Sequence, residues 1–192
     1  MFTQSLLIVD QVTSFFANDF AITDDQGAPL GTIRTEDGVG SRLLMGNREL
    51  SVYNNEGELQ VHLSDVPNFG LDSFELTGPS GEAIGTIYKE FTFFSKRLSV
   101  ELPAAPDAGT TTDRLEISGD LFDYDFTATL NGQPAAQVAR RWPGLGEALL
   151  GHNRYVVLFD RSLPELPRKA LLGAVIALDL IRAKKRRNSA NT

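Results

Sequence analysis

The segment from Pro164 to Arg187 constrains the fold of this chain more than any other part of its sequence. It reads as a helix that is apolar on nearly every side and that ends in five basic residues within six positions. Such a helix must be buried, either in protein or in lipid. Its apolar run from Ala170 to Ile181 has twelve residues and contains Asp179, whereas a bilayer core needs about 20 predominantly apolar residues. The pattern therefore predicts a helix buried in the core of the protein.

Four similar units that precede this helix have the pattern of β-hairpins. Residues 22–33 (ITDDQGAPLGTI) and 76–87 (LTGPSGEAIGTI) share a Gly five residues after the first aliphatic residue and the ending Gly-Thr-Ile. Residues 51–63 and 127–138 are variants of the same pattern. Each unit has two strand-like arms around a polar, Gly-containing turn, which is typical of a β-hairpin. Their succession predicts an antiparallel meander built from a structural repeat.

Other segments between these units complete the predicted sheet. The further strand candidates are residues 6–9, 42–44, 91–94, 97–102, 114–118 and 155–159, and a short helix is expected at 144–150. Together they predict ten to twelve strands followed by one long helix. A sheet of this size tends to curl or close, which removes its edges. We expect the apolar helix to lie inside the curled sheet.

The composition indicates one globular domain without cysteine chemistry. The 192 residues are 42% hydrophobic and 22% charged, which is typical of a folded domain with a sizeable core. We expect a single domain over residues 1–187 and a short disordered tail over 188–192. The absence of Cys excludes a disulfide framework, a thiolate nucleophile and thiolate-ligated zinc. Because the first residues lack a signal-peptide pattern, we expect a cytoplasmic protein.

The charge of the chain is unevenly distributed. The net charge is −7, yet the residues outside the basic cluster that ends the helix comprise 13 basic and 25 acidic side chains, a net of −12. An acidic body repels nucleic acid, so no nucleic-acid partner is expected. The cluster is a candidate for binding an anionic surface, and a solvated helix end, where cations suit the helix dipole, is the alternative. The cluster consists of Arg182, Lys184, Lys185, Arg186 and Arg187.

No pattern in the sequence points to catalysis or to a resident cofactor. The motifs GxSxG, HExxH and the P-loop are absent, and His62 and His152 have no ligand at metal-binding spacing. Asp123 and Asp125 alternate with aromatic residues, which predicts that both carboxylates share one strand face. There they would hold calcium or simply face solvent. We therefore expect a protein that is not an enzyme and has no cofactor.

Asp179 interrupts the apolar helix and needs a partner. A buried carboxylate without one costs several kcal/mol. We expect it to pair with Arg182, three residues further along the helix, or to lie near the rim of the sheet.

Several segments of the chain resemble the phospholipid scramblases. Ala136–Leu145 (AQVARRWPGL), followed by Glu147-Ala148, resembles their stretch Ile-Ser-Lys-x-Trp-x-Gly with a following Glu-Ala. Lys169–Asp179 is similar to their Lys-Ala…Gly-Ala…Asp segment, and Asp123–Phe126 to their Asp-x-Asp-Phe strand. The superfamily that this resemblance indicates also includes the LURP-one-related proteins and the Tubby C-terminal domain.

The resemblance implies a mainly β fold and a role near membrane lipid. The implied fold is an antiparallel closed β-barrel of about twelve strands that encloses the C-terminal hydrophobic helix. In that fold the buried central helix comprises Leu171, Leu172, Ala174, Val175, Ile176, Leu178 and Asp179.

The chain departs from the scramblases at the segment that binds calcium in that family. The matching positions before the last strand are Gly151 and Asn153, and only Asp160 remains acidic. Because two of these positions carry no charge, a hard dication loses most of its attraction. We expect no metal at this degenerate site.

Three functions follow, in this order. The first is a non-enzymatic, scramblase-related protein that lies peripherally at the inner face of the membrane, with its basic C-terminal tail on anionic phospholipid. The second, nearly level with it, is a cytosolic scaffold module that binds an unidentified protein or small ligand and has no lipid role. Active phospholipid scrambling, which only the resemblance suggests, comes third.

Overall fold

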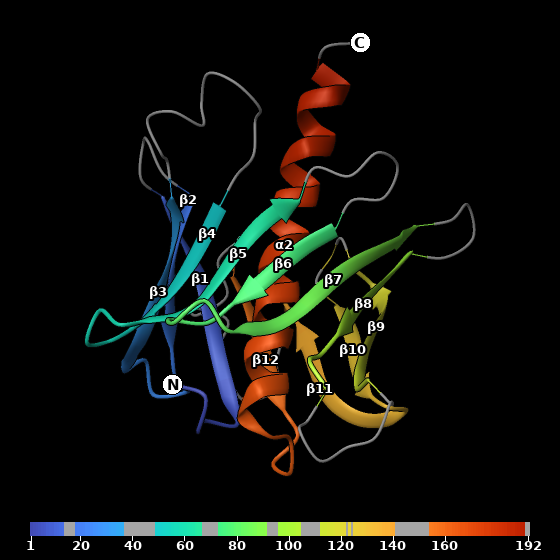
Figure 1. Ribbon diagram of the computed structural model, residues 1–192. Helices are drawn as coiled ribbons and strands as arrows, with labels where there is room; N and C mark the ends of the chain where they lie inside the picture. The colour runs from blue at the N-terminus through green and yellow to red at the C-terminus, as the bar shows by residue number, and fades with distance from the viewer. Residues whose placement is uncertain are drawn as a thin grey trace.

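A computed structural model describes residues 1–13, 18–36, 49–66, 73–91, 96–104, 112–121, 123, 125–140 and 154–190 (Figure 1). Twelve strands and one helix lie in these ranges. They are β1 (Leu6–Thr13), β2 (Asn18–Thr23), β3 (Pro29–Glu36), β4 (Glu49–Asn54), β5 (Leu59–Val66), β6 (Ser73–Thr77), β7 (Ala83–Phe91), β8 (Lys96–Glu101), β9 (Arg114–Asp120), β10 (Asp125–Leu130), β11 (Gln133–Ala139), β12 (Arg154–Phe159) and α2 (Glu165–Ala190).

The strands form one closed barrel in the order of the chain. Every strand is antiparallel to its sequence neighbour, and β1 pairs with β12, where Leu7 lies opposite Val157. The helix α2 runs through the barrel (Figure 1). The predicted fold class, a mainly β closed barrel of about twelve strands around a C-terminal helix, is confirmed.

The four predicted hairpins are β2–β3, β4–β5, β6–β7 and β10–β11. The first three have the same turn. In the first of them, the carbonyl oxygen of Asp24 accepts a hydrogen bond from the N–H of Gly27 at 3.1 Å, and the N–H of Asp24 donates one to the carbonyl oxygen of Ala28 at 3.0 Å. Gly27, Gly57 and Gly81 all have φ near +80°, where a side chain is disfavoured. The pairing register of each hairpin shifts beside its turn, as a β-bulge does.

The repeated ending Gly-Thr-Ile has a packing cause. A Cβ at Gly85 would lie 2.8 Å from the carbonyl oxygen of Glu101 on β8, and one at Gly31 would overlap the carbonyl oxygen of Tyr53 on β4. Two residues later, Ile33 and Ile87 are fully buried in the core. The Gly of the motif therefore admits the neighbouring strand, and the Ile fills the barrel.

The interior of the barrel is filled by α2. The side chains of Leu171, Leu172, Ala174, Val175, Ile176 and Leu178 are each at most 1% exposed. The helix packs against β5, β6, β7 and β8. A Cβ at Gly173 would lie 2.5 Å from a methyl carbon of Leu76 on β6. Gly at this position therefore allows the helix to approach the barrel wall closely.

The helix extends further than the expected domain boundary at residue 187. Its 26 residues continue to Ala190, so residues 188–190 of the expected tail are helical. Lys and Arg are good helix formers, and their charges near the C-terminus suit the helix dipole. No described stretch of helix is long and apolar enough to cross a membrane.

The expected strand that carries both Asp123 and Asp125 is wrong. Strand β10 begins at Asp125, whereas Asp123 lies in the preceding turn after β9. The chain has already left β9 there, because the N–H of Leu121 turns back to the carbonyl oxygen of Gly119 at 3.1 Å. The two carboxylates therefore do not share a strand face. The expected strand at 42–44 and helix at 144–150 lie outside the described residues.

Candidate functional site

The basic end of α2 leaves the barrel opposite the end where the helix begins. Strand β12 ends beside the hairpin turns, and α2 starts there and runs back through the barrel. The last turns of the helix project beyond the strands (Figure 1). The backbone of residues 182–187, which carry the basic cluster, belongs to this projecting part. The side chains of the cluster and of Asp179 lie outside the described residues, so the pairing of Asp179 with Arg182 stays a prediction.

The opposite end of α2 is fixed by Arg168. This side chain is only 6% exposed, and its guanidinium donates five hydrogen bonds to backbone carbonyl oxygens. The acceptors are those of Leu163 at 2.8 Å, Phe2 at 3.1 Å, Gln4 at 2.9 Å, Asp160 at 3.0 Å and Arg161 at 3.2 Å. The five donors match the full hydrogen-bonding capacity of an Arg side chain. A buried cation is tolerated here because its hydrogen bonds are made.

Two further contacts surround this guanidinium. It lies over the ring of Phe159, 5.4 Å from the ring centroid, which adds a cation–π attraction. The nearby carboxylate of Asp160 accepts the hydroxyl of Ser162 at 2.5 Å and its N–H at 2.8 Å. These hydrogen bonds, with a smaller contribution from the positive charge of Arg168, lower the pKa of Asp160 below its ordinary value of 3.8.

The carbonyls that Arg168 binds come from both ends of the sequence, so no local pattern predicts the cluster. The only signal in the sequence is that Arg168, with Lys169, directly precedes the long apolar run of the helix. Through these hydrogen bonds, Arg168 connects the start of α2 to the first residues of the chain and to the turn after β12.

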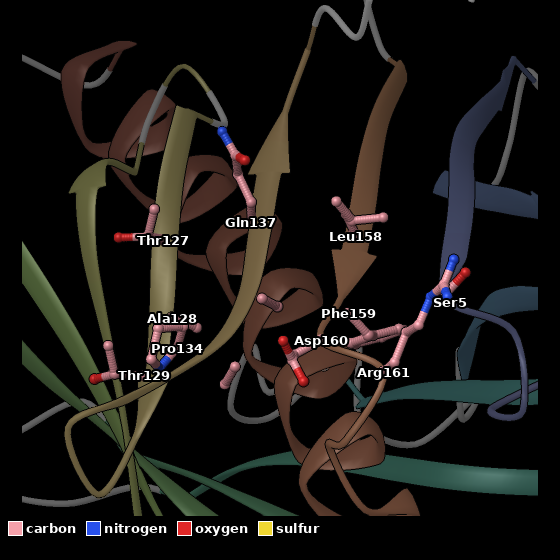
Figure 2. Close-up of a pocket in the computed structure, with 12 residues that line it drawn as sticks. Ser5, Thr127, Ala128, Thr129, Pro134, Gln137, Leu158, Phe159, Asp160 and Arg161 are labelled. Carbon is pink, nitrogen blue, oxygen red and sulfur yellow. The ribbon is translucent and has the colours of Figure 1, made fainter.

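A hollow of about 640 Å³ lies on the outer wall of the barrel, where β12 ends (Figure 2). Its floor is a row across three strands, because Thr127 lies opposite Gln137 and Gln137 lies opposite Leu158. Thr129 and its strand partner Pro134 extend this floor. The remaining lining residues are Ser5, Ala128, Ala135, Ala136, Phe159, Asp160 and Arg161.

The hollow exists because the chain leaves the sheet early at this point. The last pair between β11 and β12 is Ala136 with Phe159, followed by one hydrogen bond from the N–H of Asp160 to the carbonyl of Ala135 at 2.8 Å. The chain then turns inward to begin α2. The outer face beside Pro134 is therefore left without a neighbouring strand segment.

Polar side chains on other parts of the outer wall pair with one another. Arg114 lies 2.5 Å from the carboxylate of Glu90, which also accepts the hydroxyl of Ser99 at 2.7 Å. Arg154 pairs with Asp10 across β12 and β1.

The polar side chains of the hollow differ from these pairs. Within the described part of the chain, no side-chain hydrogen bond is formed by Ser5, Thr127, Thr129, Gln137 or Arg161. As far as the described residues show, their donors and acceptors are therefore left for a ligand.

One arrangement has the residue types of a hydrolytic triad. On β4 and β5, the hydroxyl oxygen of Ser51 lies 3.0 Å from Nδ1 of His62, whose Nε2 lies 3.9 Å from the carboxylate of Glu49. Ser51 is only 2% exposed, so a substrate has no access to its oxygen. His62 is isolated in the sequence, because Ser51 and Glu49 come from the opposite strand of the hairpin.

The calcium candidates do not form a cluster among the described residues. Asp160 has its carboxylate engaged by Ser162, and Asp123 lies 3.7 Å from the guanidinium of Arg140. Gly151 and Asn153 lie outside the described residues. In the described ranges, no three His, Cys, Asp or Glu side chains come together as a metal site would require.

Comparison with known protein families gives a match over nearly the whole chain. A family model described as LURP-one-related matches residues 4–179, a span that includes every described strand of the barrel and α2 as far as Asp179. No curated protein matches the chain.

Proposed function

We propose that this chain, which belongs to the LURP-one-related family, is a non-enzymatic protein that binds anionic membrane lipid through the basic end of α2. The observation that carries the proposal is the continuity of this helix from the barrel interior to Ala190. Because α2 is buried in the barrel and held by Arg168, its projecting end has a fixed position relative to the barrel. Here that end carries Arg182, Lys184, Lys185, Arg186 and Arg187.

The strength of such binding follows from electrostatics. Each basic residue near an anionic leaflet contributes about 1 kcal/mol, and the attraction falls off within a Debye length. Five such residues in one segment favour modest, salt-sensitive adhesion. The rest of the chain has a net charge of −12, which an anionic surface repels. The proposed orientation is therefore end-on, with the barrel held away from the lipid.

The inaccessible hydroxyl of Ser51 supports the non-enzymatic part of the proposal. A serine nucleophile must reach the substrate with a base in hydrogen-bond range. At 2% exposure, Ser51 meets the second requirement and fails the first.

Co-sedimentation with vesicles tests the proposal. The vesicles contain about 30% phosphatidylserine in phosphatidylcholine, and the comparison vesicles are pure phosphatidylcholine. The unmodified chain is expected to pellet with the anionic vesicles only. The double variant Lys184→Gln, Lys185→Gln is expected to bind about 30-fold more weakly, because it loses two contributions of about 1 kcal/mol each.

The matched control removes two charges elsewhere. The double variant Arg34→Gln, Arg97→Gln changes exposed side chains on the barrel wall and should bind as well as the unmodified chain. Equal loss in both double variants would mean that net charge, not the end of α2, governs binding.

The hollow beside β12 favours a second function, the binding of a small ligand on the barrel wall. The supporting observation is its set of polar side chains without partners in the described part of the chain. The two functions use opposite ends of the molecule and do not exclude each other.

A further inference from the structure

We infer that the hollow beside β12 binds a small organic anion that carries several hydroxyl groups, an anionic sugar, with Arg161 as the residue that takes its negative charge. The inference rests on the second proposed function and names its ligand class. The volume of about 640 Å³ lies within the usual range of small-molecule sites.

The cation in the lining favours an anion on its own side of the hollow. Arg161 is exposed and, within the described residues, its guanidinium has no side-chain or backbone acceptor. The nearest carboxylate of the lining, that of Asp160, is already engaged by two hydrogen bonds from Ser162. The guanidinium of Arg168 donates its hydrogen bonds to backbone carbonyl oxygens. The carboxylate of Asp160 keeps its negative charge, so an anion is directed to the side of the hollow that Arg161 occupies, where the guanidinium suits a carboxylate or a phosphate.

The neutral groups favour hydroxyls on the ligand. Thr127, Thr129 and Gln137 lie on the outer face of β10 and β11, and their hydroxyl and amide groups both donate and accept hydrogen bonds. Figure 2 shows the two Thr side chains on one side of the hollow, with Ser5 and Arg161 on the other. A ligand that spans the hollow therefore has its charged group at one side and its hydroxyls at the other.

The apolar part of the lining completes the match. Leu158 and Pro134 add aliphatic surface to the lining, which suits the C–H faces of a sugar ring. The hollow is open to solvent rather than enclosed, as a hydrated, polar ligand requires.

The test is a titration of the isotope-labelled full chain, followed by the NMR shifts of its backbone amides. The probes are glucuronate, which carries a carboxylate, glucose 6-phosphate, which carries a phosphate, and the neutral methyl glucoside. No vesicles are present, so the membrane proposal is not involved. We expect saturable shifts at residues 127–137 and 158–161 with at least one anion, and the stronger of the two identifies the charged group.

Three variants sharpen the result. Arg161→Gln should weaken the affinity for the anion by about tenfold or more, and Gln137→Leu should weaken it by about threefold to tenfold. The charge-matched control, the exposed Arg34→Gln on β3, should leave the affinity unchanged.

Two results would overturn the inference. If methyl glucoside binds as tightly as the anions, or if Arg161→Gln binds them normally, the ligand class is wrong while the hollow remains a binding site. If none of the three probes shifts the amides of the hollow, both the ligand class and the second proposed function fail.

Discussion

The guanidinium of Arg168 on α2 donates a hydrogen bond of 3.1 Å to the carbonyl oxygen of Phe2, 166 residues earlier in the chain. The same guanidinium also binds the carbonyls of the turn that follows β12. One side chain thereby joins the beginning of the chain, the end of the sheet and the start of the buried helix. This clamp fixes the helix axially, and the position of its basic end outside the barrel depends on it.

Removing the clamp should destabilise the whole barrel. Arg168→Leu leaves several buried carbonyls without a partner, so we expect the free energy of unfolding to fall by about 3 kcal/mol or more. Urea denaturation measures it. Arg168→Lys should be intermediate, because a point charge with three donors replaces a five-donor fork. The exposed Arg97→Leu should change stability by less than about 0.5 kcal/mol, and an equally mild effect of Arg168→Leu would contradict the clamp.

The close approach of α2 to β6 depends on Gly173. Its missing Cβ leaves room for Leu76, 2.5 Å from where that carbon would be. Gly173→Ala should therefore cost about 1–3 kcal/mol through overpacking, despite the better helix propensity of Ala. In a double-mutant cycle with Leu76→Ala, the two losses should not add, because the smaller residue makes room for the methyl group. Additive losses would argue against this contact.

The repeated hairpin turns should respond to side chains in the order of their tolerance of positive φ. At Gly57, with φ +82°, Ala should cost about 1 kcal/mol or more. Asn should cost less, because its short polar side chain adopts the left-handed conformation more readily. The space around this position is open, so sterics with neighbours do not contribute. Equal thermal stability of Gly57→Ala and the unmodified chain would show that the turn adjusts.

Asp160 should give the barrel a small pH dependence. Its pKa is lowered in the folded state, chiefly by the hydroxyl and N–H of Ser162. The resulting stabilisation is present above the ordinary pKa of 3.8 and is lost as the pH falls through the lower folded value. Unfolding midpoints of the unmodified chain and of Asp160→Asn should therefore differ at neutral pH and converge in acid. In the Ser162→Ala background, the effect of Asp160→Asn on the unfolding midpoint should be smaller. A difference in midpoint that grows as the pH falls would contradict the lowered pKa of Asp160.

The sequence predicted the parts of the fold that local patterns encode. The twelve-residue apolar run, with a length too short for a bilayer, placed the helix in the barrel. The recurring turn around Gly27 and Gly81 predicted the hairpins, since a left-handed Gly is a local requirement. The alternation around Asp123 and Asp125 misled, because a period of two does not reveal the turn that separates β9 from β10.

The parts that could not be predicted depend on distant contacts. The clamp of Arg168 needs carbonyls from residues 2 and 4, and nothing near position 168 announces them. The hollow depends on where β12 ends relative to β11, and the pairing of strands in the closed barrel determines that position. Ser51 and His62 approach each other only through the register of their hairpin. In each case the geometry follows from pairing across strands rather than from neighbours in sequence.

The salt dependence of vesicle binding tests the central claim most directly. The fraction of protein on phosphatidylserine vesicles is measured between about 0.05 M and about 0.5 M NaCl, with and without glutamine at Arg182, Lys184, Lys185, Arg186 and Arg187. Membrane attachment through the end of α2 predicts strong binding at low salt, loss of binding at high salt and no binding of the substituted chain. Binding that is equal in the two proteins, or absent from the unmodified chain at low salt, would contradict it.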